Sequence, residues 1–307
     1  MGMSFPLVSM CGSYHANKDW YSRCVSSWNR VRGVERVLVL DDGTLTDADR
    51  SRIESHGYEV WSLETVNEQV EPALRSYPAL QALREKSALF RKIVDPNILF
   101  AEEERVLFMD SDIYVRGAVE LPSDAPDLLY TIGDVSGYRG GFLLPLQHPV
   151  TTGLNAGFMY WNPSIVDLGF LNELAERYLL QIDNMWWTLQ SCWAAVAGRI
   201  DWKGAFDGRD VCNVSGLRKR TPAEVKSNTT KWVGESAEVE DPAIIEEIVD
   251  GASIVHFPGP GKRWMQDFTT PREDPDDIHT LRWEPVENAN IVERCLLALR
   301  MAWSNRE

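Results

Sequence analysis

Short apolar runs alternate with helical patterns along the first third of the 307-residue chain, and this alternation constrains the fold more than any other feature. The apolar runs end in Gly, Asp or small polar residues typical of turns, and the helical stretches repeat apolar residues three and four positions apart. Strands that alternate with helices pair in a parallel sheet, because each helix carries the chain back across one face. We therefore predict an α/β fold with a doubly wound, mostly parallel sheet. The predicted strands are 5–11, 37–40, 58–63 and 106–109, and the predicted helices are 20–28, 46–57 and 80–94, the last ending at Asp95-Pro96.

The fourth predicted strand, in RVLFMDSDIYV, runs directly into two carboxylates, Asp110 and Asp112, separated by Ser111. An ionised carboxylate is costly to bury without a partner, so these charges need compensation. The carboxyl ends of parallel strands border the crevice where α/β proteins bind ligands, which places the pair at the rim of the sheet. Because strand side chains alternate, residues two apart point to the same side, and paired carboxylates suit Mg²⁺ or Mn²⁺. Taken alone, the motif is weak, because apolar-D-x-D strings occur by chance and solvated strand ends are common.

Two later stretches add groups that suit the same chemistry. LNAGFMYWNP, from Leu154, places an amide among small residues just before an apolar strand. IVHFPGPGKRW, from Ile254, places His256 at a strand end, followed by a Gly-rich turn that carries Lys262. An imidazole can be a third metal ligand, while backbone N–H groups and an ammonium suit a diphosphate.

Taken together and in this order, DSD, LNAG and HFPGPGKRW resemble the motifs of the retaining GT-A glycosyltransferases of the glycogenin and lipopolysaccharide galactosyltransferase family. Members have D-x-D, then L-N-x-G, then H-x-x-G-x-x-K-P-W, and the resemblance covers residues 5–268. It implies a Rossmann-like GT-A domain over residues 1–270. We expect residues 271–307 to form a C-terminal extension with one helix, because Ile291, Cys295, Leu296 and Leu299 give a helical stripe.

The resemblance implies the transfer of a hexose from a nucleotide-diphosphate sugar, usually a UDP-sugar, to a hydroxyl of a saccharide or another acceptor, with retention of configuration. It implies that Asp110, Asp112 and His256 bind Mn²⁺ or Mg²⁺. It further implies that Lys262 and the backbone from Gly259 to Gly261 hold the diphosphate. The other donor-binding positions are Tyr14 on the nucleobase, Lys86 before the D-x-D, Ser111 within it, and Asn155, Ala156 and Gly157 beside the sugar. A solvated helix face for Lys86 and a plain surface position for Tyr14 stay open.

The sequence departs from the family pattern at two places. Arg263 stands where the third motif has Pro, which changes the turn or adds a cation. The family's Asp-Gln pair near the sugar falls on Leu189-Gln190, so its Asp is missing. We therefore expect Gln190 and Asn155 at the catalytic position, with Asp183 as a substitute for the absent carboxylate.

Two other functions are compatible with these motifs. A non-catalytic nucleotide-sugar-binding protein would explain the missing Asp before Gln190. A haloacid-dehalogenase-like phosphatase would use Asp110 as a nucleophile at the end of a strand. That family's motif normally opens its domain, whereas three strand–helix units precede it here, and the stretch around His256 would go unexplained.

Charge and cysteine content limit which partners and which cellular compartment we expect. Lys and Arg total 31 against 46 Asp and Glu, a net charge of −15, so nucleic acid is not an expected partner. No segment is apolar for long enough to predict a transmembrane helix, and the N-terminus does not resemble a secretory signal. Five scattered Cys without a C-x-x-C pair are typical of a reducing compartment, so we expect a cytoplasmic protein. The helix near residue 291 is a candidate contact for a homo-oligomer.

Overall fold

The first part of the chain follows the predicted alternation of strands and helices. The computed structural model describes residues 4–133, 141–182, 185–219, 236–271 and 277–304. The strands of the first part are β1 (Phe5–Cys11), β2 (Val34–Asp41), β3 (Glu59–Trp61) and β4 (Val106–Met109). Its helices are α1 (Ser13–Ala16), α2 (Asp19–Ser27), α3 (Asp47–Glu54), α4 (Leu63–Leu74), α5 (Pro78–Lys86) and α6 (Ala88–Leu99).

The rest of the chain does not keep this regular alternation. Its strands are β5 (Ile113–Val115), β6 (Val119–Glu120), β7 (Leu128–Ile132), β8 (Leu154–Trp161), β9 (Lys203–Phe206), β10 (Val211–Asn213), β11 (Leu217–Lys219), β12 (Ser236–Glu238), β13 (Ile254–His256), β14 (His279–Thr280) and β15 (Trp283–Pro285). Its helices are α7 (Leu144–Gln147), α8 (Leu168–Leu174), a π-helical turn (Ala175–Leu179), α9 (Met185–Gly198), α11 (Pro242–Val249), the 3₁₀ turn η4 (Gly259–Trp264), α12 (Met265–Phe268) and α13 (Ile291–Ser304).

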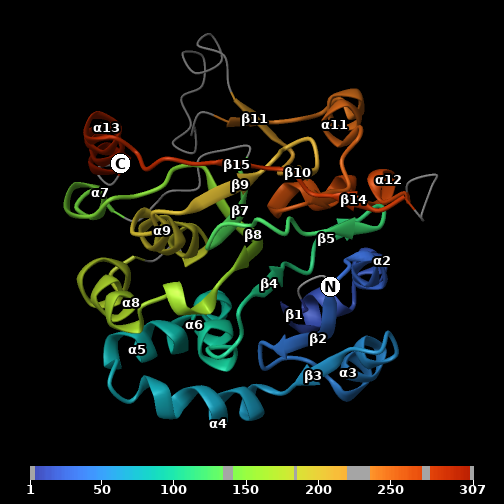
Figure 1. The fold of residues 1–307 in the computed structure, drawn as a ribbon, viewed down its shortest axis with the longest axis horizontal. Helices are drawn as coiled ribbons and strands as arrows, with labels where there is room; N and C mark the ends of the chain where they lie inside the picture. The colour runs from blue at the N-terminus through green and yellow to red at the C-terminus, as the bar shows by residue number, and fades with distance from the viewer. Residues whose placement is uncertain (1–3, 134–140, 183–184, 220–235, 272–276, 305–307) are drawn as a thin grey trace.

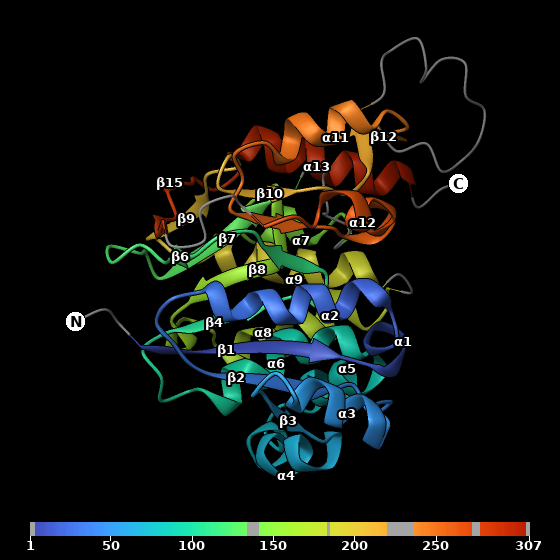
Figure 2. The ribbon, with the colours of Figure 1, turned by 90° about the vertical axis from the view of Figure 1, so that its right-hand side faces the viewer.

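One eight-stranded sheet runs through the molecule in the order β15-β9-β7-β8-β4-β1-β2-β3 (Figure 1). Strands β4, β1, β2 and β3 pair in parallel and lie side by side in Figure 2, and β7 pairs in parallel with β9. Strand β8 is antiparallel to both β4 and β7, and β15 is antiparallel to β9. The predicted α/β class with a mostly parallel sheet is confirmed. The antiparallel strands come from the region after residue 117, where the sequence alternation ends.

Both faces of the large sheet are covered by helices, and β1 shows how the sequence achieves this. Its seven residues are all buried, with Leu7 and Val8 pointing to opposite faces. Leu7 packs in one core with Val25 of α2, and Val8 packs in another with Phe90 of α6. Figure 1 shows α2 and α3 on one side of β1 and β2, and α5 and α6 on the other.

A second, three-stranded sheet has the order β10-β13-β5. Its strand β5 follows β4 of the large sheet after three residues, Asp110 to Asp112. Strand β13 lies antiparallel to β5 and parallel to β10. The chain therefore crosses from one sheet to the other at the D-x-D motif.

The helical region before β4 differs from the sequence prediction. The predicted helix 80–94 is two helices, because Ser87 takes an extended conformation and its side chain caps α6 through the Leu89 N–H. The predicted end at Asp95-Pro96 is wrong, since α6 continues through Pro96 to Leu99. Helix α4 was not predicted, although Val66, Val70 and Leu74 form its buried stripe.

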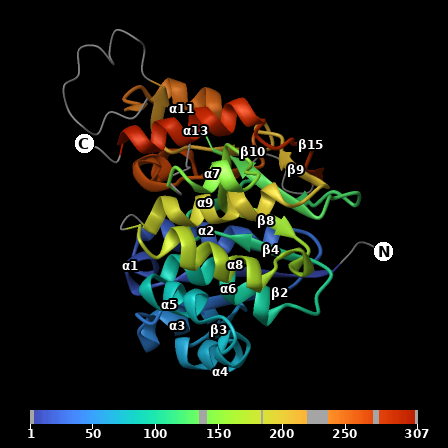
Figure 3. The same cartoon turned by 90° about the vertical axis from the view of Figure 1, so that its left-hand side faces the viewer.

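The residues after Pro271 contribute to the sheets as well as forming the expected helix. Strand β15 pairs with β9 at one edge of the large sheet, and β14 pairs in parallel with β6. Helix α13 follows and lies next to α7 (Figure 3). Within the described ranges, no helix combines the length and apolar character needed to cross a membrane.

A buried ion pair joins α5 to α6 across the break at Ser87. Arg84 Nε lies 2.6 Å from Asp95 Oδ1, and an Arg84 terminal nitrogen lies 3.1 Å from Asp95 Oδ2. Both side chains are buried, and burial raises the pKa of the Asp95 carboxyl although Arg84 acts in the opposite direction. We predict that Arg84→Met leaves the Asp95 charge uncompensated and lowers the free energy of unfolding by about 3–5 kcal/mol, as measured by urea denaturation.

The matched control replaces both partners, Arg84→Met with Asp95→Leu. Because an apolar pair of similar volume removes the buried charge, most of the lost stability should return. A single variant as stable as the wild type would show that the ion pair does not hold the two helices.

Candidate active site

The D-x-D carboxylates are positioned by a turn between two sheets. Asp110 N donates a hydrogen bond to Gly157 O of β8 (2.7 Å), and Ile113 N donates to Asp110 O (3.2 Å). The predicted convergence of the two side chains is therefore found, but its predicted cause is not. The strand ends at Met109, and the reversal of the chain over Asp110 to Asp112 brings the carboxylates together.

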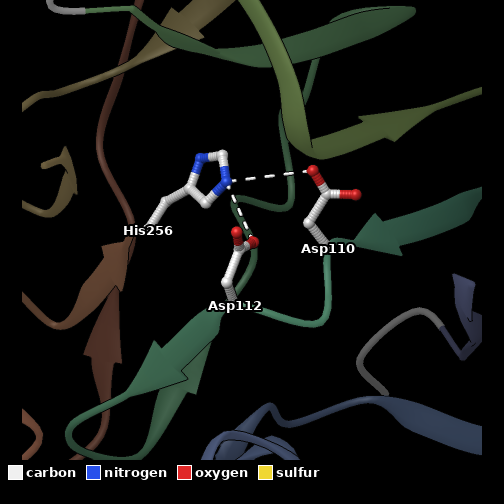
Figure 4. Close-up of side chains that lie close together, drawn as sticks. All are labelled: Asp110, Asp112 and His256. Atoms are coloured by element: carbon white, nitrogen blue, oxygen red, sulfur yellow. Dashed lines mark ion pairs between the residues drawn. The ribbon is translucent and has the colours of Figure 1, made fainter. Parts of the chain in front are cut away.

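His256 reaches the carboxylates through strand pairing in the small sheet. It is the last residue of β13 and lies opposite Ile113, the first residue of β5. Phe257 N donates to Asp112 O (3.1 Å), which holds the two segments together beyond the strands. His256 Nε2 consequently lies 3.2 Å from Asp112 Oδ1 and 3.8 Å from Asp110 Oδ2 (Figure 4).

Gly157 provides the space that the imidazole occupies. A Cβ built on Gly157 would lie 2.1 Å from Cε1 of His256, far inside van der Waals contact. Gly157 is also the residue whose carbonyl binds Asp110 N. The LNAG segment therefore positions both the backbone of Asp110 and the imidazole of His256, and the lack of a side chain at Gly157 is what makes room for the imidazole.

The three side chains fit a divalent metal ion. One ligand atom from each of Asp110, Asp112 and His256 lies within 4.8 Å of the others. Asp112 Oδ1 and His256 Nε2 are buried 3.2 Å apart without hydrogen-bond geometry, and His256 Nδ1 is buried without a hydrogen-bond partner. Buried polar atoms need a partner, and two carboxylates with one imidazole are a donor set that accepts Mn²⁺ or Mg²⁺.

Two lysines from separate elements flank the acidic pair. Lys92 Nζ, on α6, lies 2.5 Å from Asp110 Oδ1, and Lys262 Nζ, in η4, contacts Asp112 Oδ2. Burial would raise the pKa of the Asp112 carboxyl, but Lys262 and His256 outweigh it and hold that pKa far below its usual range. Asp112 is therefore ionised across the physiological pH range.

The turn that carries Lys262 is built by two glycines. Gly259 has a φ of 53°, in the left-handed region that favours glycine. A Cβ on Gly261 would lie 1.7 Å from Val214 O, so this residue lets the turn pack against the backbone that follows β10. Gly261 N also donates to Pro258 O (3.0 Å). These contacts fix the direction in which Lys262 leaves the backbone.

Gln190 and Asn155 meet at the start of β8. Gln190 Oε1, on α9, accepts a hydrogen bond from Ala156 N (2.8 Å). Asn155 Oδ1 accepts one from Gly157 N (2.8 Å). Gln190 thus lies beside the LNAG segment, whereas Asp183 lies outside the described residues.

Lys86 and Tyr14, two predicted donor-binding residues, contact other parts of the chain. Lys86 Nζ donates to Leu180 O (2.7 Å) and Ile182 O (3.3 Å), so its ammonium is engaged beyond the π-helical turn. Lys92 is the lysine that reaches the D-x-D, and its shorter separation from Asp110 in the sequence was the signal that could have identified it. Tyr14 is 70% exposed, with the Lys18 ammonium 4.4 Å from its ring centre. Ser111 is buried within the turn.

An aromatic pair that the sequence reasoning missed borders this site. The rings of His15 and Trp20 lie 5.9 Å apart, and Lys262 Nζ lies 5.9 Å from the Trp20 ring centre. Burial lowers the pKa of His15, and Lys262 and Lys92 lower it further, which places His15 within range of the same charges. Their positions after β1 gave no motif that could have identified them.

Comparisons with known proteins were made on sequence and on structure. No protein-family model and no curated protein matches the chain by sequence. The structure is similar to that of the galactosyltransferase LgtC in complex with donor and acceptor sugar analogues, with a TM-score of 0.43 and 14% identity over 88% of this chain and 98% of that chain. It is also similar to mouse xyloside xylosyltransferase 1 in its apo form, with a TM-score of 0.47 and 11% identity over 83% and 98%.

The apo glycosyltransferase GlyE of Streptococcus pneumoniae is a third match, with a TM-score of 0.45 and 12% identity over 83% of this chain and 54% of that chain. The chain is similar in fold to solved glycosyltransferases.

The close packing of Gly157 against His256 gives a direct test of the metal site. We predict that Gly157→Ala displaces the imidazole and weakens Mn²⁺ binding, measured by titration calorimetry, about 10- to 100-fold. The matched control is Gly208→Ala, because a Cβ at Gly208 has no atom within 4 Å. Equal Mn²⁺ affinity of the Gly157 variant and the control would exclude His256 as a ligand.

Proposed function

We propose that the protein is a metal-dependent glycosyltransferase. It moves a hexose from a nucleotide-diphosphate sugar, with UDP as the carrier, to a hydroxyl of a saccharide or another acceptor, with retention of configuration. The observation that carries this proposal is the convergence of Asp110, Asp112 and His256 beside Lys92 and Lys262. A site with these groups suits a polyanionic ligand in an otherwise acidic protein, and a diphosphate is the ligand with the matching charge.

Cleavage of the bond between a sugar and a diphosphate builds negative charge on the phosphate oxygens. A Mn²⁺ or Mg²⁺ ion held by Asp110, Asp112 and His256 would supply positive charge beside that leaving group. Lys262 and Lys92 would donate hydrogen bonds to its oxygens, an electrostatic contribution of about 3 kcal/mol for each well-placed donor. The η4 backbone that positions Lys262 would border the same oxygens.

The amide groups of Gln190 and Asn155 support a reaction without a protein nucleophile. Both side-chain oxygens accept backbone N–H groups, which fixes the amides so that their –NH₂ groups could donate to a sugar oxygen. The acceptor hydroxyl would then attack the anomeric carbon from the face that the diphosphate leaves. One carbon–oxygen bond breaks, a new one forms to the acceptor oxygen, and the acceptor proton passes to the departing phosphate oxygen. Configuration is retained because both bonds lie on one face of the sugar.

We also propose that the protein acts in the cytoplasm. The five cysteines, all within the described residues, form no disulfide there, and Cys295 is exposed, which a reducing compartment allows. Intracellular pools of nucleotide-diphosphate sugars would then be directly available as donors.

The function is tested by incubating the protein with Mn²⁺ and a panel of nucleotide-diphosphate sugars. We expect slow hydrolysis of one donor without an acceptor, faster turnover with one, loss of turnover with EDTA, and a retained anomeric configuration by NMR. Asp112→Asn is the inactive control. If a nucleotide diphosphate binds with metal while every donor stays intact, the protein is a non-catalytic nucleotide-sugar binder. Release of phosphate from a phosphomonoester would instead indicate a phosphatase.

A matched pair of variants distinguishes whether Lys92 or Lys86 acts on the donor. We predict that Lys92→Met lowers kcat/KM for the donor about 100-fold, because it removes a cation beside the leaving group. Lys86→Met should change kcat/KM less than about threefold, because its ammonium contacts backbone carbonyls elsewhere. The reverse ranking would return the donor-binding role to Lys86.

A further inference from the structure

Exposed apolar side chains concentrate on two neighbouring helical segments. In the described part of the chain, seven of the thirteen large apolar side chains that are exposed lie on α13 or on the segment at α7. Arg294 of α13 ties the two together by donating to Pro145 O (2.6 Å) and Leu146 O (3.1 Å). Figure 3 shows α13 and α7 side by side at the molecular periphery. The seven, which we name the α13 patch, are Phe142, Leu143, Leu146, Ile291, Val292, Leu296 and Leu299.

Helix α13 is apolar on two faces, and the protein core uses one of them. Leu297, Ala298 and Met301 are buried against the rest of the molecule. On the other face Val292, Leu296 and Leu299 are 64%, 54% and 66% exposed, and Cys295 is exposed between them. A surface helix ordinarily has one apolar face, so the second face is suited to a partner.

The spacing of this second face is the same in both directions along the helix. Val292, Cys295, Leu296 and Leu299 are separated by three, one and three residues. A two-fold axis perpendicular to α13, between residues 295 and 296, therefore places Val292 opposite Leu299 and Cys295 opposite Leu296 of a second copy. An interface of two identical surfaces requires this kind of self-complementarity.

The charges beside the stripe favour the same antiparallel arrangement. Glu293 and Arg300 are two helical turns apart, so they lie on the same flank of the stripe, and both are exposed. In an antiparallel pair the same flanks of the two helices meet, so Glu293 of each copy comes near Arg300 of the other. A parallel pair would place this flank against Ile291 and Ala298 instead.

We propose that the α13 patch binds a second copy of this chain through antiparallel pairing of α13. A lipid surface fits it less well, because interfacial helices carry many Lys and Arg, whereas α13 has Arg294, already bound to α7, and Arg300. The largest apolar patch of an ordinary monomer covers roughly 300–600 Å², and a stable dimer buries about 800 Å² per partner. Two helical segments with seven exposed apolar side chains can supply an area of this order once the polar rim is added.

Sedimentation velocity of the full chain over a concentration series tests the proposal. We expect a monomer–dimer equilibrium, with dimerisation weakened at least about a hundredfold by Leu296→Glu with Leu299→Glu. The control variant, Ile244→Glu with Ile248→Glu, changes two exposed apolar residues of α11 and should dimerise like the wild type. Circular dichroism verifies that both variants are folded.

Cross-linking identifies the register. Cys295 is the one exposed cysteine, so a short bifunctional maleimide should link wild-type dimers through it and leave Cys295→Ser unlinked. Glu293→Arg should weaken the dimer, and Glu293→Arg with Arg300→Glu should restore it. A wild type that sediments as a monomer at every concentration would overturn the proposal. So would a dimer that the leucine variants leave intact, or a monomer that floats with phosphatidylcholine vesicles through the same leucines.

Discussion

Buried negative charge at the junction of two sheets is the constraint on which the rest of the structure depends. Asp112 is 6% exposed and lies three residues after a fully buried strand. Such a charge is tolerated only where positive or polar groups surround it. Three side chains from different parts of the chain surround the carboxylates. Asp110 is contacted by Lys92 of α6, and Asp112 by His256 of β13 and Lys262 of η4. Compensation of the negative charge in this short turn thus brings together residues that are up to 150 positions apart in the sequence.

The sequence predicted those parts of the site in which a short local pattern also fixes where the functional residue lies. A strand end identifies where Asp110 and His256 lie, and a Gly-rich turn identifies Lys262, because each feature is complete within about ten residues. Lys92 escaped prediction because its direction depends on where α6 begins, and the extended conformation of Ser87 resets that start. The cause assigned to the carboxylate pair was wrong for a related reason, since a turn and an alternating strand look the same over three residues.

The second half of the fold illustrates what pattern alone could not provide. The sequence of β8 predicts an apolar strand, but it does not predict that the strand lies between β4 and β7 and antiparallel to both. Strands β13 and β5 have three residues each, too few for a periodic signal, and their pairing is what delivers the imidazole. The prediction succeeded for parallel strands with helical connections and gave no order for strands whose partners are distant in the sequence. The same holds for β15, which follows Pro271 and forms one edge of the large sheet.

The absence of a side chain at Gly157 has a consequence for how this protein can change over evolutionary time. The backbone at this residue lies against the imidazole on one side and accepts a hydrogen bond from Asp110 N through its carbonyl, while its neighbour Ala156 donates to Gln190 Oε1. Substitutions along this segment would therefore also shift Asp110 and His256. We therefore expect this strand to diverge slowly among the protein's descendants.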